Sequence, residues 1–184
     1  RDFGENYAEE LVTKSSQLRH LQDIRWVYIG QLQSNKIQKI VKSADEIQSI
    51  ASAKHARYVQ RYASELGKRD FPVWIVVNAG NEDSKQGLPL GETDQLARFI
   101  QSECPNLSLQ GLMAIPPQTY SDSSCVTGGK PTPPELYKTL RMSAEKVGRG
   151  KLSLGMTGDL TIAIAAGSDC VRIGTAIFGE RSKK

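Results

Sequence analysis

Two short clusters of glycine and threonine near the end of the chain contain residue types that bind phosphate. They are GMTGD at residues 155–159 and RIGT at residues 172–175. Gly174 lets backbone N–H groups approach an anion closely, and the hydroxyls of Thr157 and Thr175 add donors. The same residues would also suit ordinary turns and a helix cap, so the spacing alone leaves both interpretations open.

Arg172 and Asn6 are two further candidates for a binding site. Arg172 stands between Val171 and Ile173 in an apolar stretch, where a charge is costly unless it is paired. It either points outward between helices or points into a site and binds a ligand. Asn6 follows a short strand-like segment, where it either faces the same site or caps the next helix.

Apolar, strand-like segments alternate with amphipathic, helix-like segments along the chain, which predicts parallel βαβ units. The predicted strands cover residues 2–6, 23–30, 46–50, 71–77, 107–115, 151–156 and 170–178. The predicted helices cover residues 7–18, 34–42, 53–66, 93–104, 135–147 and 160–166. A stretch rich in Ser, Thr, Gly and Pro at residues 116–134 is predicted to be a mobile loop.

The order of these elements favours a barrel. No glycine fingerprint follows the first strand, which argues against an open doubly wound sheet. We therefore predict an α/β fold, a parallel (β/α)8 barrel of the TIM type, with the first β/α unit absent from the chain. Residues 1–184 would form a single barrel domain. Sites in such barrels lie at the carboxyl ends of the strands, and phosphates often bind after the last two strands, where both clusters fall.

Composition and charge exclude several classes of protein. The net charge of +4 is scattered along the chain, which argues against nucleic-acid binding. No apolar stretch is long enough to span a bilayer. The three cysteines form no CxxC pair, and the two histidines have no partners at ligand spacing, so we expect neither a disulfide framework nor a metal site.

Five motifs occur in the order of a known family. They are FGENY at residues 3–7, WVYIGQLQSNK at 26–36, GLMAI at 111–115, LSLGMTGD at 152–159 and VRIGTAIFGER at 171–181. On these motifs the chain resembles the pyridoxal phosphate homeostasis proteins, which share the barrel of the alanine racemase N-terminal domain. The resemblance covers essentially the whole chain.

The resemblance implies a protein that binds pyridoxal 5′-phosphate (PLP) and acts in intracellular vitamin B6 homeostasis as a non-catalytic carrier or regulator. Asn6 would lie beside the cofactor, Thr157, Gly174 and Thr175 around its phosphate, and Arg172 near its pyridine nitrogen. An arginine there keeps that nitrogen unprotonated and makes it a weaker electron sink than a carboxylate partner would. The resemblance also implies a cytoplasmic protein, with the mitochondrion as the alternative. We expect a monomer whose partner is the small-molecule cofactor, with no nucleic acid and no membrane.

The chain departs from the family pattern at three points. The family's reactive lysine belongs to the β/α unit before FGEN, which is absent here, so we expect this chain to lack covalent attachment of the cofactor. Lys36 and Lys85 lie in loops, and the remaining lysines fall on helices, outer loops, the tail or the start of a strand. Val27 stands where a histidine is common, and Thr157 replaces the usual serine.

Two other functions remain open at this point. A PLP-dependent amino-acid racemase would need a second acid/base, which related racemases supply from a further domain for which this chain leaves no room. The third possibility is a barrel that binds another phosphorylated metabolite.

Overall fold

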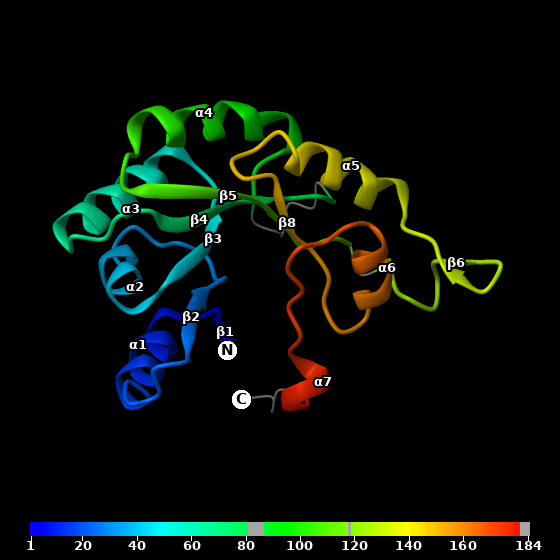
Figure 1. Cartoon of the computed structure of the whole chain (residues 1–184), viewed down its shortest axis with the longest axis horizontal. Helices are drawn as coiled ribbons and strands as arrows, with labels where there is room; N and C mark the ends of the chain where they lie inside the picture. The colour runs from blue at the N-terminus through cyan, green and yellow to red at the C-terminus, as the bar shows by residue number, and fades with distance from the viewer. Residues whose placement is uncertain (81–86, 118, 181–184) are drawn as a thin grey trace.

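The computed structural model describes residues 1–80, 87–117 and 119–180 and contains one large parallel sheet. Its strands follow one another in chain order: β1 (Asp2–Glu5), β2 (Arg25–Tyr28), β3 (Glu46–Ile50), β4 (Phe71–Val77), β5 (Leu107–Ala114) and β8 (Lys151–Ser153). Every neighbouring pair is parallel. The sheet curls into a half-barrel, as the alternating sequence pattern predicts (Figure 1).

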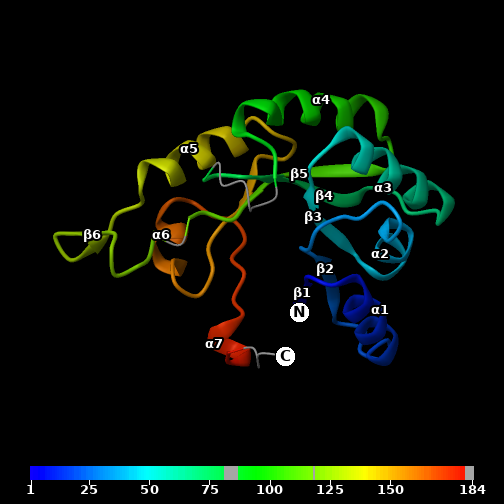
Figure 2. The same cartoon turned by 180° about the vertical axis from the view of Figure 1, so that it is seen from behind.

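Helices cover the outer face of this half-barrel (Figures 1 and 2). They are α1 (Ala8–Gln17), α2 (Ile37–Ser43), α3 (Ala53–Glu65), α4 (Thr93–Glu103), preceded by the 3-10 turn η1 (Leu90–Glu92), and α5 (Glu135–Ala144). Local signals define their ends. Ser52 Oγ accepts a hydrogen bond from the N–H of His55 at the start of α3, and Gly67, with φ of 66°, follows its end. Across the described residues, no helix combines the length and apolar character needed to cross a membrane.

The sheet is buried on both faces. Val73, Ile75 and Val77 of β4 belong to the main hydrophobic core, which the helices cover. The intervening Trp74 and Val76 join Met113 in a separate cluster. Because successive side chains of a strand point to opposite faces, this second cluster lies on the inner, concave face of the sheet. The unbroken apolar run of β4 reflects this double burial.

The predicted strand at residues 170–178 is wrong. Cys170 makes a single parallel bridge to Ser153, and the residues that follow lead into a short helix, α7 (Thr175–Phe178). The reason is that the pairing is brief. Backbone hydrogen bonds join Leu154 to Cys170 and Arg172 to Gly155 just beyond β8, and among the described residues none continues this ladder past Arg172. Ile177 and Phe178 are 66% and 71% exposed, so the apolar run does not mark a buried strand.

The segment at residues 116–134 contains more regular structure than predicted. It includes a hairpin of β6 (Val126–Thr127) and β7 (Lys130–Pro131), in which Thr127 pairs with Lys130. Gly128 and Gly129 connect the two strands, and both have a positive φ. Two glycines of this kind suit the tight turn that a two-residue hairpin requires.

Gly30 allows the ends of β1 and β2 to approach closely. A Cβ atom at this position would lie 1.8 Å from the carbonyl oxygen of Asn6 and 2.9 Å from its Cα. The clash would be with backbone, which cannot rotate away as a flexible side chain can. Glycine is therefore required here for β1 to keep its place beside β2.

We expect Gly30→Ala to destabilise the fold by about 1–3 kcal/mol or more, the usual cost of overpacking a tight site. The midpoint of urea unfolding should fall accordingly. Gly91→Ala is the matched control, because a Cβ there would meet no atom within 4 Å. Equal midpoints for the two variants would show that the β1–β2 contact is loose.

Candidate cofactor site

The first of the two predicted clusters forms a tight turn directly after β8. Asp159 is 3% exposed, and its buried carboxylate stabilises the turn by accepting hydrogen bonds. Oδ1 of Asp159 accepts a hydrogen bond from the N–H of Met156 at 2.7 Å, which closes the turn around Thr157. The turn continues into α6 (Leu160–Ala165), where the N–H of Ala163 donates to the carbonyl of Asp159.

Tyr137, a fully buried residue of α5, supports this turn from the outer helix layer. Its hydroxyl donates to Oδ2 of Asp159 at 2.5 Å, and the two carboxylate oxygens of Asp159 thus serve different partners. Burial, together with the hydrogen bond and charge of Asp159, raises the pKa of Tyr137 well above its ordinary value. Tyr137 therefore remains a proton donor over the whole physiological pH range.

Asp122, in the segment at residues 116–134, stabilises the same turn by further hydrogen bonds. Its Oδ1 and Oδ2 accept hydrogen bonds from the N–H groups of Ile162 and Thr161, at 2.9 and 3.0 Å. Its own N–H donates to the carbonyl of Gly158 at 2.9 Å. The backbone hydrogen bonds to the carboxylate lower the pKa of Asp122 against the opposing, largest effect of burial. The turn is therefore held by two carboxylates from different parts of the chain.

The second cluster lies against the first. The N–H of Arg172 donates to the carbonyl of Gly155 at 2.9 Å, and the N–H of Ala176 approaches Oγ1 of Thr157 at 3.4 Å. The structure thus places the turn around Thr157 beside the segment that contains Gly174 and Thr175, and the binding of a phosphate by these residues stays a prediction. No acceptor in the described part of the chain takes the N–H groups of Gly174 or Thr175, and both residues are exposed.

Arg172 points inward rather than out between the helices. Its guanidinium donates to Ser153 Oγ at 2.7 Å and to the carbonyl of Ala114 at 2.8 Å. Burial lowers the pKa of the Arg172 guanidinium from its ordinary value, although the group remains only partly enclosed. Among the described residues, no carboxylate forms an ion pair with Arg172. The cation is thus held by neutral acceptors, which leaves its charge available for a ligand.

Asn6 lies at the opposite end of the row of strands from the other four candidate residues. It follows the end of β1, whereas Thr157, Arg172, Gly174 and Thr175 follow β8. Both positions are at the carboxyl ends of strands, which face the same mouth in a parallel barrel. No hydrogen bond joins Asn6 to the other four in the described structure, so its place beside a ligand stays a prediction.

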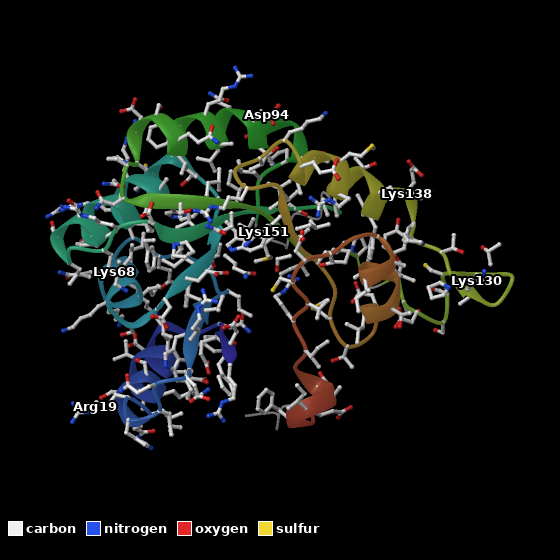
Figure 3. All side chains as sticks on the ribbon, viewed as in Figure 1. Arg19, Lys68, Asp94, Lys130, Lys138 and Lys151 are labelled. Atoms are coloured by element: carbon white, nitrogen blue, oxygen red, sulfur yellow. The ribbon has the colours of Figure 1, made fainter. Side chains whose placement is uncertain are left out.

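Figure 3 labels Lys68, Lys130, Lys138 and Lys151, and none of these four ends a strand of the sheet. Lys36 lies in the loop between β2 and α2. Lys151 is the first residue of β8, which places it at the opposite end of the barrel from the mouth. Lys130 lies on the hairpin and Lys138 on α5, and Lys68 donates to the carbonyl of Ala44 beyond α3. Lys85 falls outside the described residues.

Several residues of this site were not found from the sequence. Ser153, Tyr137 and Asp122 received no role, and Asp159 appeared only as part of a motif. A polar residue within an apolar strand, such as Ser153, is a signal that could have been followed. Tyr137 and Asp122 carry no such signal, because their partners lie 22 and about 40 positions away along the chain.

Comparisons with known proteins agree on one fold and one family. The family model of the alanine racemase N-terminal domain matches residues 1–182. The pyridoxal phosphate homeostasis protein of Caenorhabditis elegans is 40% identical over 193 aligned residues, which cover 100% of this chain and 78% of that protein. PipY of Synechococcus elongatus, solved with and without PLP, superimposes with TM-scores of 0.76 and 0.80 at 29% and 30% identity. These alignments cover 96% of this chain and 81% of PipY. An alanine racemase of Clostridium difficile shares the fold with a TM-score of 0.71 at 12% identity, covering 99% of this chain and 46% of the racemase.

We expect Tyr137→Phe to destabilise the protein by about 1–3 kcal/mol, because it leaves a buried carboxylate oxygen without its donor. The pKa of Tyr137 is raised in the folded state, so this contribution is complete below the unfolded pKa of about 10.0 and declines as the pH rises above it. Urea unfolding at pH 7 and pH 11 measures both effects. Tyr58→Phe on α3 is the control, since no hydrogen bond of its hydroxyl supports the turn. A wild-type minus variant difference that does not shrink at pH 11 would contradict this account.

Proposed function

The chain belongs to the family of the pyridoxal phosphate homeostasis proteins, within the fold of the alanine racemase N-terminal domain, and from this premise we propose that it binds PLP at the mouth of its half-barrel. We further propose that it serves intracellular vitamin B6 homeostasis as a carrier or regulator, without catalysis. The solved relative PipY supports the first part because its structure was determined with PLP bound. The second part is supported by the relatives of Caenorhabditis elegans and Vibrio alginolyticus, which are both named pyridoxal phosphate homeostasis proteins.

The observation that carries the proposal is the inward-facing cation of Arg172. Its hydrogen bonds go to a serine hydroxyl and a backbone carbonyl, so no acidic side chain of the described chain neutralises it. Beside it, the hydroxyl of Thr157 and the backbone N–H groups of Gly174 and Thr175 are donors for which the described residues supply no acceptor. Such a set suits a ligand with a phosphate and an aromatic nitrogen that accepts a hydrogen bond.

Each of these residues would have a distinct task when the cofactor is bound. The backbone N–H groups of Gly174 and Thr175, with the hydroxyls of Thr157 and Thr175, would hold the phosphate. Arg172 would donate to the pyridine nitrogen, which arginine cannot protonate because its own pKa remains too high. PLP supplies an aldehyde that condenses with amines and a ring that withdraws electrons from the attached carbon.

An arginine, Arg172, as the hydrogen-bond partner of the pyridine nitrogen would favour a carrier over an enzyme. An unprotonated pyridine withdraws electrons less strongly than a pyridinium, so carbanion chemistry on the cofactor would be poorly supported. Racemisation also needs a second acid/base on the opposite face. No observation of this structure favours that alternative.

We expect Thr175→Val to weaken PLP binding by about 1–3 kcal/mol, which corresponds to roughly 5- to 150-fold in Kd, because it removes a donor to the phosphate. Fluorescence or dialysis titration with PLP and with pyridoxal, which lacks the phosphate, distinguishes a loss of phosphate binding from a general loss of binding. The variant should bind PLP more weakly than the wild type and bind pyridoxal equally well. Thr13→Val, an exposed position on α1, is the control. Unchanged affinity for PLP would move the phosphate elsewhere.

We also expect no specific covalent attachment of PLP to the lysines of this chain. The reason is that none of the described lysines ends a strand of the sheet, the position from which we expect an amine to be held at the aldehyde. Reduction of the PLP-saturated protein with borohydride, followed by peptide mapping, tests this directly. A stoichiometric pyridoxyl group on Lys36 or Lys85 would overturn the expectation.

A further inference from the structure

Hydrogen bonds among four polar side chains cross the interior of the half-barrel. They lead from Arg172 to the buried carboxylate of Glu46. Arg172 Nη1 donates to Ser153 Oγ at 2.7 Å, and Ser153 Oγ donates to Gln48 Oε1 at 2.8 Å. Gln48 Nε2 then donates to Glu46 Oε1 at 2.7 Å. Glu46 Oε2 accepts from Arg25 Nη2 at 3.2 Å, at the edge of the same face. We call the first four residues the inner chain.

The inner chain must run through the inside of the curved sheet. Gln48 belongs to β3 and Ser153 to β8, and two further strands, β4 and β5, separate them in the sheet. A direct contact of 2.8 Å between them is therefore possible only across the concave face. Burial agrees with this position, since Ser153 is 0%, Gln48 3% and Glu46 8% exposed.

The donors and acceptors fix the direction of every hydrogen bond in the inner chain. A guanidinium can only donate, so the Ser153 hydroxyl accepts from Arg172 and turns its own hydrogen toward Gln48. The Gln48 amide must then place its oxygen toward Ser153 and its nitrogen toward Glu46. A carboxylate is the terminal acceptor. The order cannot be reversed, and it links the partly enclosed cation of Arg172 at one end to the buried carboxylate of Glu46 at the other.

We propose that Gln48 is a positioning residue for Arg172, which it orients through Ser153, and that Glu46 supplies the negative charge that anchors this orientation. The inference rests on the proposed function, because it assigns Gln48 a part in the recognition of the pyridine nitrogen. Gln48 itself touches no cofactor. Without its amide, the Ser153 hydroxyl has no fixed acceptor, and only the carbonyl of Ala114 still orients the guanidinium of Arg172 firmly.

The first experiment measures the affinity for PLP and for its benzene-ring analogue, in which a C–H replaces the pyridine nitrogen. Gln48→Met should weaken PLP binding by about tenfold, the effect of one hydrogen bond, and should abolish the preference for PLP over the analogue. In an Arg172→Met background the same substitution should have no further effect, because its action passes through Arg172. Gln60→Met on α3, whose amide pairs with Asn106 far from the mouth, is the control.

A second variant gives a readout that a merely structural role would not produce. Gln48→Glu keeps the shape of the side chain, and burial beside Glu46 raises the pKa of the introduced carboxyl. In its protonated form this carboxyl donates to Glu46 and accepts from Ser153 as the amide does. The affinity for PLP, relative to wild type, should therefore be nearly normal at pH 6 and fall as the pH rises through 8. A ratio that is independent of pH would overturn the proposal.

A measurement without ligand separates this inference from the proposed function. In nuclear magnetic resonance spectra, the guanidinium N–H signals of Arg172 should be sharp in the wild type and in Gln60→Met, and broadened in Gln48→Met, where only the Ala114 carbonyl still restrains the group firmly. Unchanged signals in Gln48→Met would refute the positioning role, whatever the protein binds. If these signals respond as expected but the wild type does not bind PLP, then the proposed function fails while the orienting role of Gln48 stands.

Discussion

The structure depends above all on the need to compensate a charge inside a parallel sheet. The inner face of the half-barrel is filled mostly by apolar side chains such as Trp74, Val76 and Met113, which offer Arg172 no partner. An isolated cation there would be strongly disfavoured. The protein meets this constraint with neutral acceptors close to the guanidinium and a carboxylate, Glu46, at the far end of a run of hydrogen bonds. The arrangement keeps Arg172 charged and leaves the side facing the mouth free of an acidic partner.

The neighbouring turn at residues 155–159 is also built on charged groups that are compensated by hydrogen bonds. The Thr157 hydroxyl and the nearby backbone N–H groups could bind an anion only if other groups fix the backbone of this turn. Asp159 and Asp122 do this from below and from the side, and both use their oxygens on backbone N–H groups or on Tyr137 rather than on a cation. Negative charges close to an anion site would oppose binding if they faced it. Here hydrogen bonds from Tyr137 and from the backbone turn them into structural acceptors, and Arg172 provides the positive charge nearby.

The family and the proposed function agree with this division of tasks. A carrier has to bind its cofactor reversibly and needs little help in activating it. A neutral pyridine nitrogen beside an arginine suits that purpose, because it secures the ring without making it a strong electron sink. The shared fold with an alanine racemase shows that the same scaffold also occurs in an enzyme, so the fold does not by itself decide the function.

The sequence by itself determined the alternation of strands and helices and the class of the fold, and it supplied the candidate residues for the site. These features follow from local properties: the apolar run of β4, the periodic helices, and motifs such as GMTGD whose residues are adjacent in the chain. The tertiary structure alone decided the rest. The segment 170–178 looks like a strand, but among the described residues its backbone pairing beside the end of β8 stops at Arg172, and Thr175–Phe178 forms a helix. The partnership of Gln48 with Ser153 joins residues 105 positions apart, and that of Tyr137 with Asp159 joins residues 22 apart. The sequence shows that a polar side chain is present. Its hydrogen-bond partner depends on which strands the curvature of the sheet brings face to face.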